Sequence, residues 1–256
     1  MKILILMSYY NRPVLVRAAL GSILEADEHH QDWHLLFGDD NSAIPGRPIC
    51  EEILKDKLDQ VTFVNSNMTL EDKLKHGLML GFFCNETIRQ SDADVGIMFC
   101  DDDQLYPTYL KNLSEFFTNN PDVLYCYSKI HLYNPLLQKI DGVHNLTGRY
   151  NQWSEPINPV NNVDASQVAW RLDCCKKLGA WFADSTLKED GKPWTRDTDK
   201  SFFQNLYEKC GPCYPTGFVG QFKGVHDYQL LWHKNVGEDG LKSYDDMIKE
   251  SAGVRF

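Results

Sequence analysis

Three consecutive aspartates, Asp101, Asp102 and Asp103, are the sharpest candidate for chemistry in this 256-residue sequence. They directly follow an apolar run over 95–100 that is typical of a buried strand. In an extended segment side chains alternate, so we expect Asp101 and Asp103 on one side and Asp102 on the other. Two converging carboxylates repel each other unless a cation lies between them, and oxygen ligands suit Mg²⁺ or Mn²⁺. A solvated acidic turn is the alternative interpretation.

A second candidate is the pair Cys210 and Cys213, which has the Cys-x-x-Cys spacing of dithiol redox sites. In such sites the first cysteine opens a helix after a strand, where the helix dipole lowers its pKa. Here the pair follows a predicted helix, and no second pair completes a zinc site. The context therefore argues against a redox or zinc role.

The first hundred residues predict the strands and helices that would position the aspartates. Short apolar runs predict strands over 3–7, 33–38, 61–64 and 95–100. The segments between them have helical spacing over 14–26, 50–57 and 70–89. This alternation predicts an α/β sheet that is mainly parallel and flanked by helices. Ligands of such sheets lie beyond the carboxyl ends of the strands, where polar turns follow the first, second and fourth strands.

The second half is less regular. We expect helices over 110–117, 174–178 and 198–209, and strands over 123–128, 166–171 and 218–225. The long irregular stretch 134–163 is a candidate lid over a donor or acceptor, with disorder as the alternative. Trp170 and Trp181 are expected in the core. We find no internal repeat and no linker, so one domain with a mixed sheet is the simplest interpretation.

Composition limits the partners and the compartment. The chain carries 36 acidic and 26 basic residues, a formal charge of −10, which disfavours binding along a nucleic-acid duplex. No stretch approaches the length of an apolar membrane span, and the N-terminal segment lacks the pattern of a signal peptide. The eight cysteines are scattered, and a chain of this length needs no disulfides. We expect a soluble, cytoplasmic protein.

Five segments, in order along the chain, together resemble glycosyltransferase family 2 and its GT-A fold. They are 7–13 with 21–24, 37–42, 97–107 with its Asp-x-Asp motif, 169–171 with 178–182, and 196–199. The last resembles the family's Glu-Asp-x-Asp segment but has Arg196 in place of the usual Glu. The resemblance covers residues 1–235. It implies a single GT-A domain over 1–256, with a nucleotide-sugar half over 1–110 and an acceptor half over 111–256.

The resemblance implies a role for each matched position. The nucleotide-sugar pocket would be lined by Tyr9, Asn11, Arg12 and Asp102, with Asp39 or Asp40 on the base. The metal would be held by Asp101 and Asp103, with His226, or in its place His233, completing the shell. The catalytic base would be Asp197, with Asp199 as the alternative. The acceptor would contact Trp194 and Asp164.

The activity so implied is a metal-dependent, inverting transfer of a sugar from a nucleoside diphosphate donor to an acceptor hydroxyl. Mn²⁺ or Mg²⁺ would stabilise the leaving diphosphate, and a carboxylate would take the acceptor proton. A UDP-sugar is the commonest donor of the family. The acceptor could be a glycan, another hydroxyl compound or a DNA base, the last disfavoured by charge. A nucleotidyltransferase would need a glycine-rich basic loop that the sequence lacks. A non-catalytic sugar- or nucleotide-binding module remains a further alternative.

Overall fold

The structure is a computed structural model that describes residues 1–67, 80–134, 139–140, 154–182 and 198–224. The first half has the elements β1 (Ile3–Tyr9), α1 (Leu15–Asp27), β2 (Trp33–Asp39), α2 (Gly46–Ile53), η1 (Leu58–Gln60), β3 (Val61–Asn65), α4 (Leu80–Gln90) and β4 (Val95–Cys100). The second half has β5 (Gln104–Leu105), α5 (Tyr109–Asn119), β6 (Tyr125–Asn134), β7 (Lys139–Ile140), η2 (Ala165–Gln167), β8 (Val168–Arg171), α6 (Asp173–Lys176), α7 (Thr198–Cys210) and β9 (Tyr214–Gly224).

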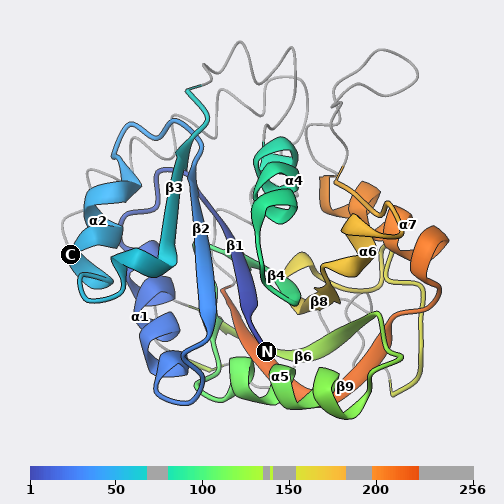
Figure 1. Ribbon diagram of the computed structural model, residues 1–256. Helices are drawn as coiled ribbons and strands as arrows, with labels where there is room; N and C mark the ends of the chain where they lie inside the picture. The colour runs from blue at the N-terminus through green and yellow to red at the C-terminus, as the bar shows by residue number, and fades with distance from the viewer. Residues whose placement is uncertain (68–79, 135–138, 141–153, 183–197, 225–256) are drawn as a thin grey trace, which may run out of the picture.

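All these strands belong to one nine-stranded sheet in the order β3-β2-β1-β4-β8-β6-β9-β5, with β7 paired to β6. Figure 1 shows β3, β2, β1 and β4 side by side. The first four strands are parallel to one another, as the alternation predicts. β8 is antiparallel to both β4 and β6, whereas β9 runs parallel to β6 and antiparallel to β5. The predicted mixed α/β architecture is confirmed.

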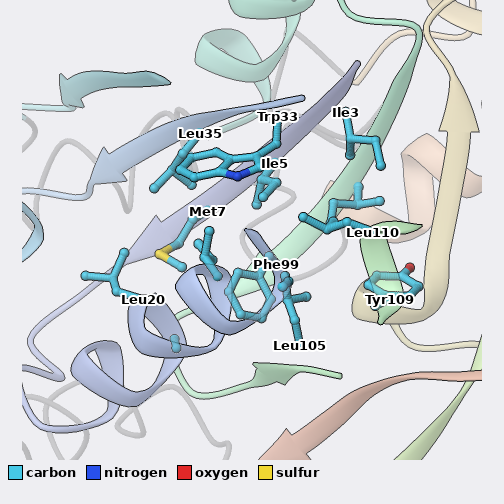
Figure 2. Packing of buried hydrophobic residues seen from close by; sticks show 14 of the residues in the cluster. Ile3, Ile5, Met7, Leu20, Trp33, Leu35, Phe99, Leu105, Tyr109 and Leu110 are labelled. Carbon is cyan, nitrogen blue, oxygen red and sulfur yellow. The ribbon is translucent and has the colours of Figure 1, made fainter. Parts of the chain in front are cut away.

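The two faces of the sheet carry two separate cores. Along β1, Ile3, Ile5 and Met7 pack with α1, α2 and α5, while Leu4 and Leu6 pack with α4, α6 and α7. This follows from the two-residue repeat of a strand, which sends successive side chains to opposite faces. Figure 2 shows the first core, with β1 side chains beside Trp33 and Phe99. Helices on both faces explain why the strands are continuous apolar runs.

Trp170 is fully buried in the second core, as expected, and makes edge contacts with Phe182 and Phe202, whose rings stack on each other. Its strand partner on β4 is Gly96. A Cβ atom at Gly96 would lie 2.8 Å from the indole ring, so this position has room only for glycine. Trp181 is partly buried, and the guanidinium of Arg89 lies 4.8 Å from the centre of its ring.

Several element bounds differ from those expected. α2 begins at Gly46 rather than residue 50, because the carboxylate of Asp39 accepts a hydrogen bond from the Gly46 N–H. β9 begins at Tyr214 rather than residue 218, and β6 extends to Asn134, because the two strands pair with each other. The candidate lid over 134–163 is described only in part, so its role stays a prediction. Among the helices of the described segments, none has the length and apolarity to cross a membrane.

Candidate active site

The three aspartates lie in a turn that directly follows β4. The N–H of Asp103 donates to the carbonyl of Cys100 at 3.3 Å, which closes the turn. Asp101, Asp102 and Asp103 are 3%, 2% and 0% exposed, so the solvated acidic turn is wrong as an interpretation. Buried carboxylates need hydrogen bonds or cations, and this turn has both.

Arg12, three residues after β1, is the first of these cations. Its Nη1 atom lies 2.8 Å from Oδ1 of Asp101 and 3.0 Å from Oδ2 of Asp102. The two carboxylates therefore converge on one atom, and the expectation that they face opposite sides is wrong. The physical reason is the turn, which ends the extended geometry on which alternation depends.

Lys223, near the end of β9, is the second cation. Its Nζ atom lies 3.3 Å from Oδ2 of Asp103 and 3.2 Å from Oδ1 of Asp164. Burial lowers the pKa of Lys223, but the charges of Asp103 and Asp164 outweigh it and raise that pKa well above its ordinary value. Lys223 therefore keeps its positive charge at neutral pH.

Asp164, expected to contact the acceptor, caps η2. Its Oδ1 atom accepts hydrogen bonds from the N–H of Ser166 at 3.1 Å and from the Ser166 hydroxyl at 2.7 Å. Burial raises the pKa of Asp164, but Lys223 and the Ser166 hydrogen bonds outweigh it and lower that pKa. Asp164 is therefore an ionised partner of Lys223.

A divalent metal fits the chemistry of this cluster. One ligand atom from each of Cys100, Asp102 and Asp103 lies within 4.8 Å of the other two. Burial raises the pKa of the Cys100 thiol well above its ordinary value, so the two carboxylates are the stronger donors. In the ion pairs of the described residues, the carboxylates of Asp101, Asp102, Asp103 and Asp164 face the two cations Arg12 and Lys223. A divalent cation would offset that difference in charge.

Asp101 is bound differently from its two neighbours. Its Oδ2 atom accepts a hydrogen bond from the N–H of Tyr10 at 3.1 Å, in addition to the Arg12 contact. Burial raises the pKa of Asp101 to about 6, against the opposing effect of Arg12. Asp101 therefore joins the loop after β1 to the turn after β4. Among the described residues, the grouped ligand atoms come from Asp102 and Asp103 but not from Asp101, and the metal role expected for Asp101 and Asp103 stays a prediction.

The loops after β1 and β2 are also joined. The N–H of Asn11 donates to the hydroxyl of Ser42 at 3.1 Å, and the side-chain oxygen of Asn11 accepts from the N–H of Ile44 at 3.2 Å. Asn11 has a φ of 51° and Asn41 a φ of 58°, a region that asparagine enters more readily than most residues. Each loop therefore turns sharply at an asparagine two residues beyond the end of its strand.

The sequence does not decide whether Asp39 or Asp40 would contact the base, and the two differ in burial and in hydrogen bonds. Both carboxylate oxygens of Asp39 accept backbone N–H groups at 2.8 Å, from Ser42 and Gly46, and the side chain is buried. Asp40 is partly exposed. Asp39 therefore shapes the loop, and Asp40 is the better candidate for a contact with a base. Tyr9 has a similar supporting position, because it is buried and its hydroxyl donates to the carbonyl of Ile44.

The remaining predicted residues are placed only in part. Asp199 lies in the first turn of α7. Four candidates fall outside the described residues, namely Trp194, Asp197, His226 and His233. Cys210 is the last residue of α7, one residue beyond the expected end of that helix, and all eight cysteines are free thiols.

Lys223 and Cys100 are the two site residues that the sequence interpretation missed. Cys100 directly precedes the aspartates, so its position was a usable signal. Lys223 lies in a predicted strand, where a lysine among aromatic and glycine residues is unusual, but its partner Asp103 is 120 positions away. No local sequence pattern predicts that Lys223 contacts Asp103.

The sequence matches a known family over more than half of its length. Residues 4–152 match the sequence profile of "Glycosyl transferase family 2". Among curated proteins, Protein CgeD of Bacillus subtilis (strain 168) is 24% identical over 177 residues, which are 69% of this chain and 38% of that protein. The resemblance first inferred from the motifs is thus confirmed by an independent match.

Solved structures of low sequence identity share the fold. S. aureus TarS 1–349 in complex with UDP-GlcNAc has a TM-score of 0.65 at 15% identity, over 89% of this chain and 59% of that one. The mannosyltransferase PcManGT from Pyrobaculum calidifontis, in complex with GDP-Man and Mn²⁺, has a TM-score of 0.61 at 13% identity, over 91% of this chain and 60% of that one. The chain therefore spans less than two thirds of the length of these relatives.

Proposed function

The chain belongs to glycosyl transferase family 2, and from that premise we propose that it transfers a sugar from a nucleoside diphosphate donor to an acceptor hydroxyl. The observation that carries the proposal is the convergence of the buried carboxylates of Asp102 and Asp103 after β4, beside the guanidinium of Arg12. The site lies past the carboxyl ends of β1 and β4, where α/β sheets bind ligands.

The donor is a nucleotide sugar, and a UDP-sugar is our first choice. TarS and PcManGT, which share the fold, are described in complex with UDP-GlcNAc and with GDP-Man. In this chain Asp40 would accept an N–H of the base, while Asp39 holds the loop that presents it. Arg12 would hold the acidic turn in place.

Asp102 and Asp103 would hold a divalent cation, Mn²⁺ or Mg²⁺, which would stabilise the negative charge of the leaving diphosphate as a Lewis acid. A metal that also binds substrate phosphates is usually held by one or two protein carboxylates, and the phosphates and water complete its coordination shell. PcManGT, whose complex contains Mn²⁺, supports this assignment by its fold.

The acceptor hydroxyl must lose a proton as it attacks, and a carboxylate within hydrogen-bond reach is suited to that task. We propose Asp197 as this base, with Asp199 in the first turn of α7 as the alternative. Placed on the face of the sugar opposite the diphosphate, it would make the displacement in-line and inverting. The acceptor class is a glycan or another hydroxyl compound, and the net charge of −10 disfavours DNA.

The test measures nucleotide release and nucleotide binding together. The purified chain is incubated with UDP-, GDP- and TDP-sugars and a panel of glycan acceptors, with Mn²⁺, with Mg²⁺ or with EDTA. We expect one donor to release nucleotide in the presence of metal and acceptor, and EDTA to abolish the release. Absence of both release and metal-dependent nucleotide binding for every donor would overturn the proposal. Binding without release in any acceptor reaction would favour the non-catalytic module.

A further inference from the structure

Lys223 places a buried positive charge beside the acidic turn after β4. Its side chain is 11% exposed, and the Asp103 side chain that it contacts at 3.3 Å is 0% exposed. Placing an ammonium group this deep is unfavourable unless opposite charges compensate it. The two carboxylates that do so, Asp103 and Asp164, come from the turn after β4 and the start of η2.

The position of Lys223 is fixed by the backbone and not only by its side-chain contacts. β9 pairs with β5 so that Phe222 lies opposite Gln104 and Gln221 opposite Leu105. Extended by one residue beyond β5, this antiparallel register would bring Lys223 opposite Asp103, in agreement with their ion pair. On the other side, Asp164 is held by both the N–H and the hydroxyl of Ser166. The ammonium therefore lies between Asp103 and an Asp164 carboxylate that Ser166 holds in place.

We propose that Lys223 is a positioning residue that brings a positive charge to the metal and diphosphate site through its contacts with Asp103 and Asp164. It holds Asp103, one of the two carboxylates assigned to the metal, so the cation shares that ligand with an ammonium group. The same charge attracts the diphosphate of the donor. The second effect rests on the proposed function, whereas the first concerns the metal alone. Lys223 comes from the acceptor half of the chain but acts on the donor site.

Loss of the Lys223 charge should change the affinities for a cation and for an anion in opposite directions. A merely structural role of Lys223 would not have this effect. Removal of the ammonium leaves the carboxylates with less positive charge around them. A divalent cation should then bind more tightly and a nucleoside diphosphate less tightly. Loss of local folding would weaken both.

The experiment compares four substitutions. Lys223→Met removes the charge, Lys223→Arg keeps it, and Lys129→Met is the matched control, since Lys129 is also partly buried and lies on the neighbouring strand β6. Lys223→Gln is the second neutral variant, which keeps an N–H donor for the carboxylates if Lys223→Met fails to fold. Circular dichroism and melting temperature in Mn²⁺ establish folding first.

Two affinities are then measured for each folded protein. Mn²⁺ binding without nucleotide is followed by electron paramagnetic resonance, and UDP and GDP binding in EDTA by calorimetry. We expect the neutral variant to bind Mn²⁺ about tenfold more tightly and the diphosphate about tenfold more weakly, from loss of one nearby unit charge. Lys223→Arg and Lys129→Met should stay close to the wild type.

Unchanged Mn²⁺ affinity in the neutral variant, or weaker binding of both ligands, would overturn the proposal. A wild-type protein that binds no nucleotide under any condition would instead overturn the proposed function. In that case the Mn²⁺ measurement alone still decides the role of Lys223, so the two failures are distinguishable.

Discussion

Arg12 and Asp101 are 89 positions apart in the sequence, yet Nη1 of Arg12 lies 2.8 Å from Oδ1 of Asp101. The same nitrogen lies 3.0 Å from Asp102, and the N–H of Tyr10 donates to the other oxygen of Asp101. The loop after β1 is thus held to the acidic turn after β4 before any ligand arrives. A site that is already ordered loses less conformational entropy when its ligand binds.

Removal of either proposed metal carboxylate should strongly impair metal-dependent function. Asp102→Asn and Asp103→Asn keep the side-chain shape but remove a charge, so we expect weaker Mn²⁺ binding and transfer reduced by about 100-fold or more. Electron paramagnetic resonance measures the first effect and nucleotide release the second. Asp122→Asn is the control, because Asp122 is exposed. Wild-type Mn²⁺ affinity in both variants would remove these residues from the metal site.

Substitution of Asp39 should mainly lower the stability of the fold, whereas substitution of Asp40 should mainly weaken nucleotide binding. Asp39→Asn replaces an acceptor by an amide group that faces a backbone N–H, so we expect a loss of about 1–3 kcal/mol in the free energy of unfolding. Asp40→Asn should change that free energy less and weaken nucleotide binding by about 10- to 100-fold, the range for a hydrogen bond to a charged group. Denaturant titration and calorimetry measure the two quantities. The reverse pattern would exchange the two roles.

Two glycine-to-alanine substitutions should have opposite effects on stability. At Gly96 the new methyl group would lie 2.8 Å from the Trp170 ring, and overpacking of this kind costs about 1–3 kcal/mol. At Gly21, within α1, nothing lies within 4 Å of the new methyl group, and alanine is favoured over glycine in a helix by about 0.5–1 kcal/mol. Urea denaturation gives both values. Equal stability of the two variants would mean that the Gly96 contact is relieved by movement of the indole.

His34 on β2 should make the protein less stable in mild acid. Burial, assisted by the charge of Lys2, lowers the pKa of His34, whose ring accepts from or donates to the hydroxyl of Thr62. The unfolded chain, with a pKa of about 6.5, then binds more protons than the folded one, so stability falls as the pH drops below that value. His34→Gln should remove this part of the pH dependence. Denaturation midpoints at pH 7.5 and 5.0, compared between variant and wild type, test it, and an identical pH dependence would contradict it.

The first half of the fold was predictable because its information is local. Runs such as 3–7 and 95–100 are apolar at every position, which is what a strand covered by helices on both faces requires. β5 has only two residues and owes its existence to pairing with β9, so no periodicity could reveal it. The early start of β9, at Tyr214 and Pro215, likewise depends on β6.

The site was predictable to the same extent. The position of the acidic turn follows from the strand before it, and the structure confirms that its residues are buried. Which cation each of the three aspartates contacts could not be predicted, because it depends on the turn geometry and on the positions of Arg12 and Lys223. Lys223 could not be matched to Asp103, because register between distant strands is set by the assembled sheet.

The distance along the chain between Asp103 and Lys223 also dictates when the site comes into existence. β1 to β4 lie within the first hundred residues and can assemble early, during synthesis or refolding. The contact of Asp103 with Lys223, however, joins residues 120 positions apart, and contacts that close such long loops form late. An intermediate with the parallel strands formed would thus possess the aspartates but not their second cation. Ligand binding in a refolding experiment therefore reports the pairing of β9 rather than the collapse of the core.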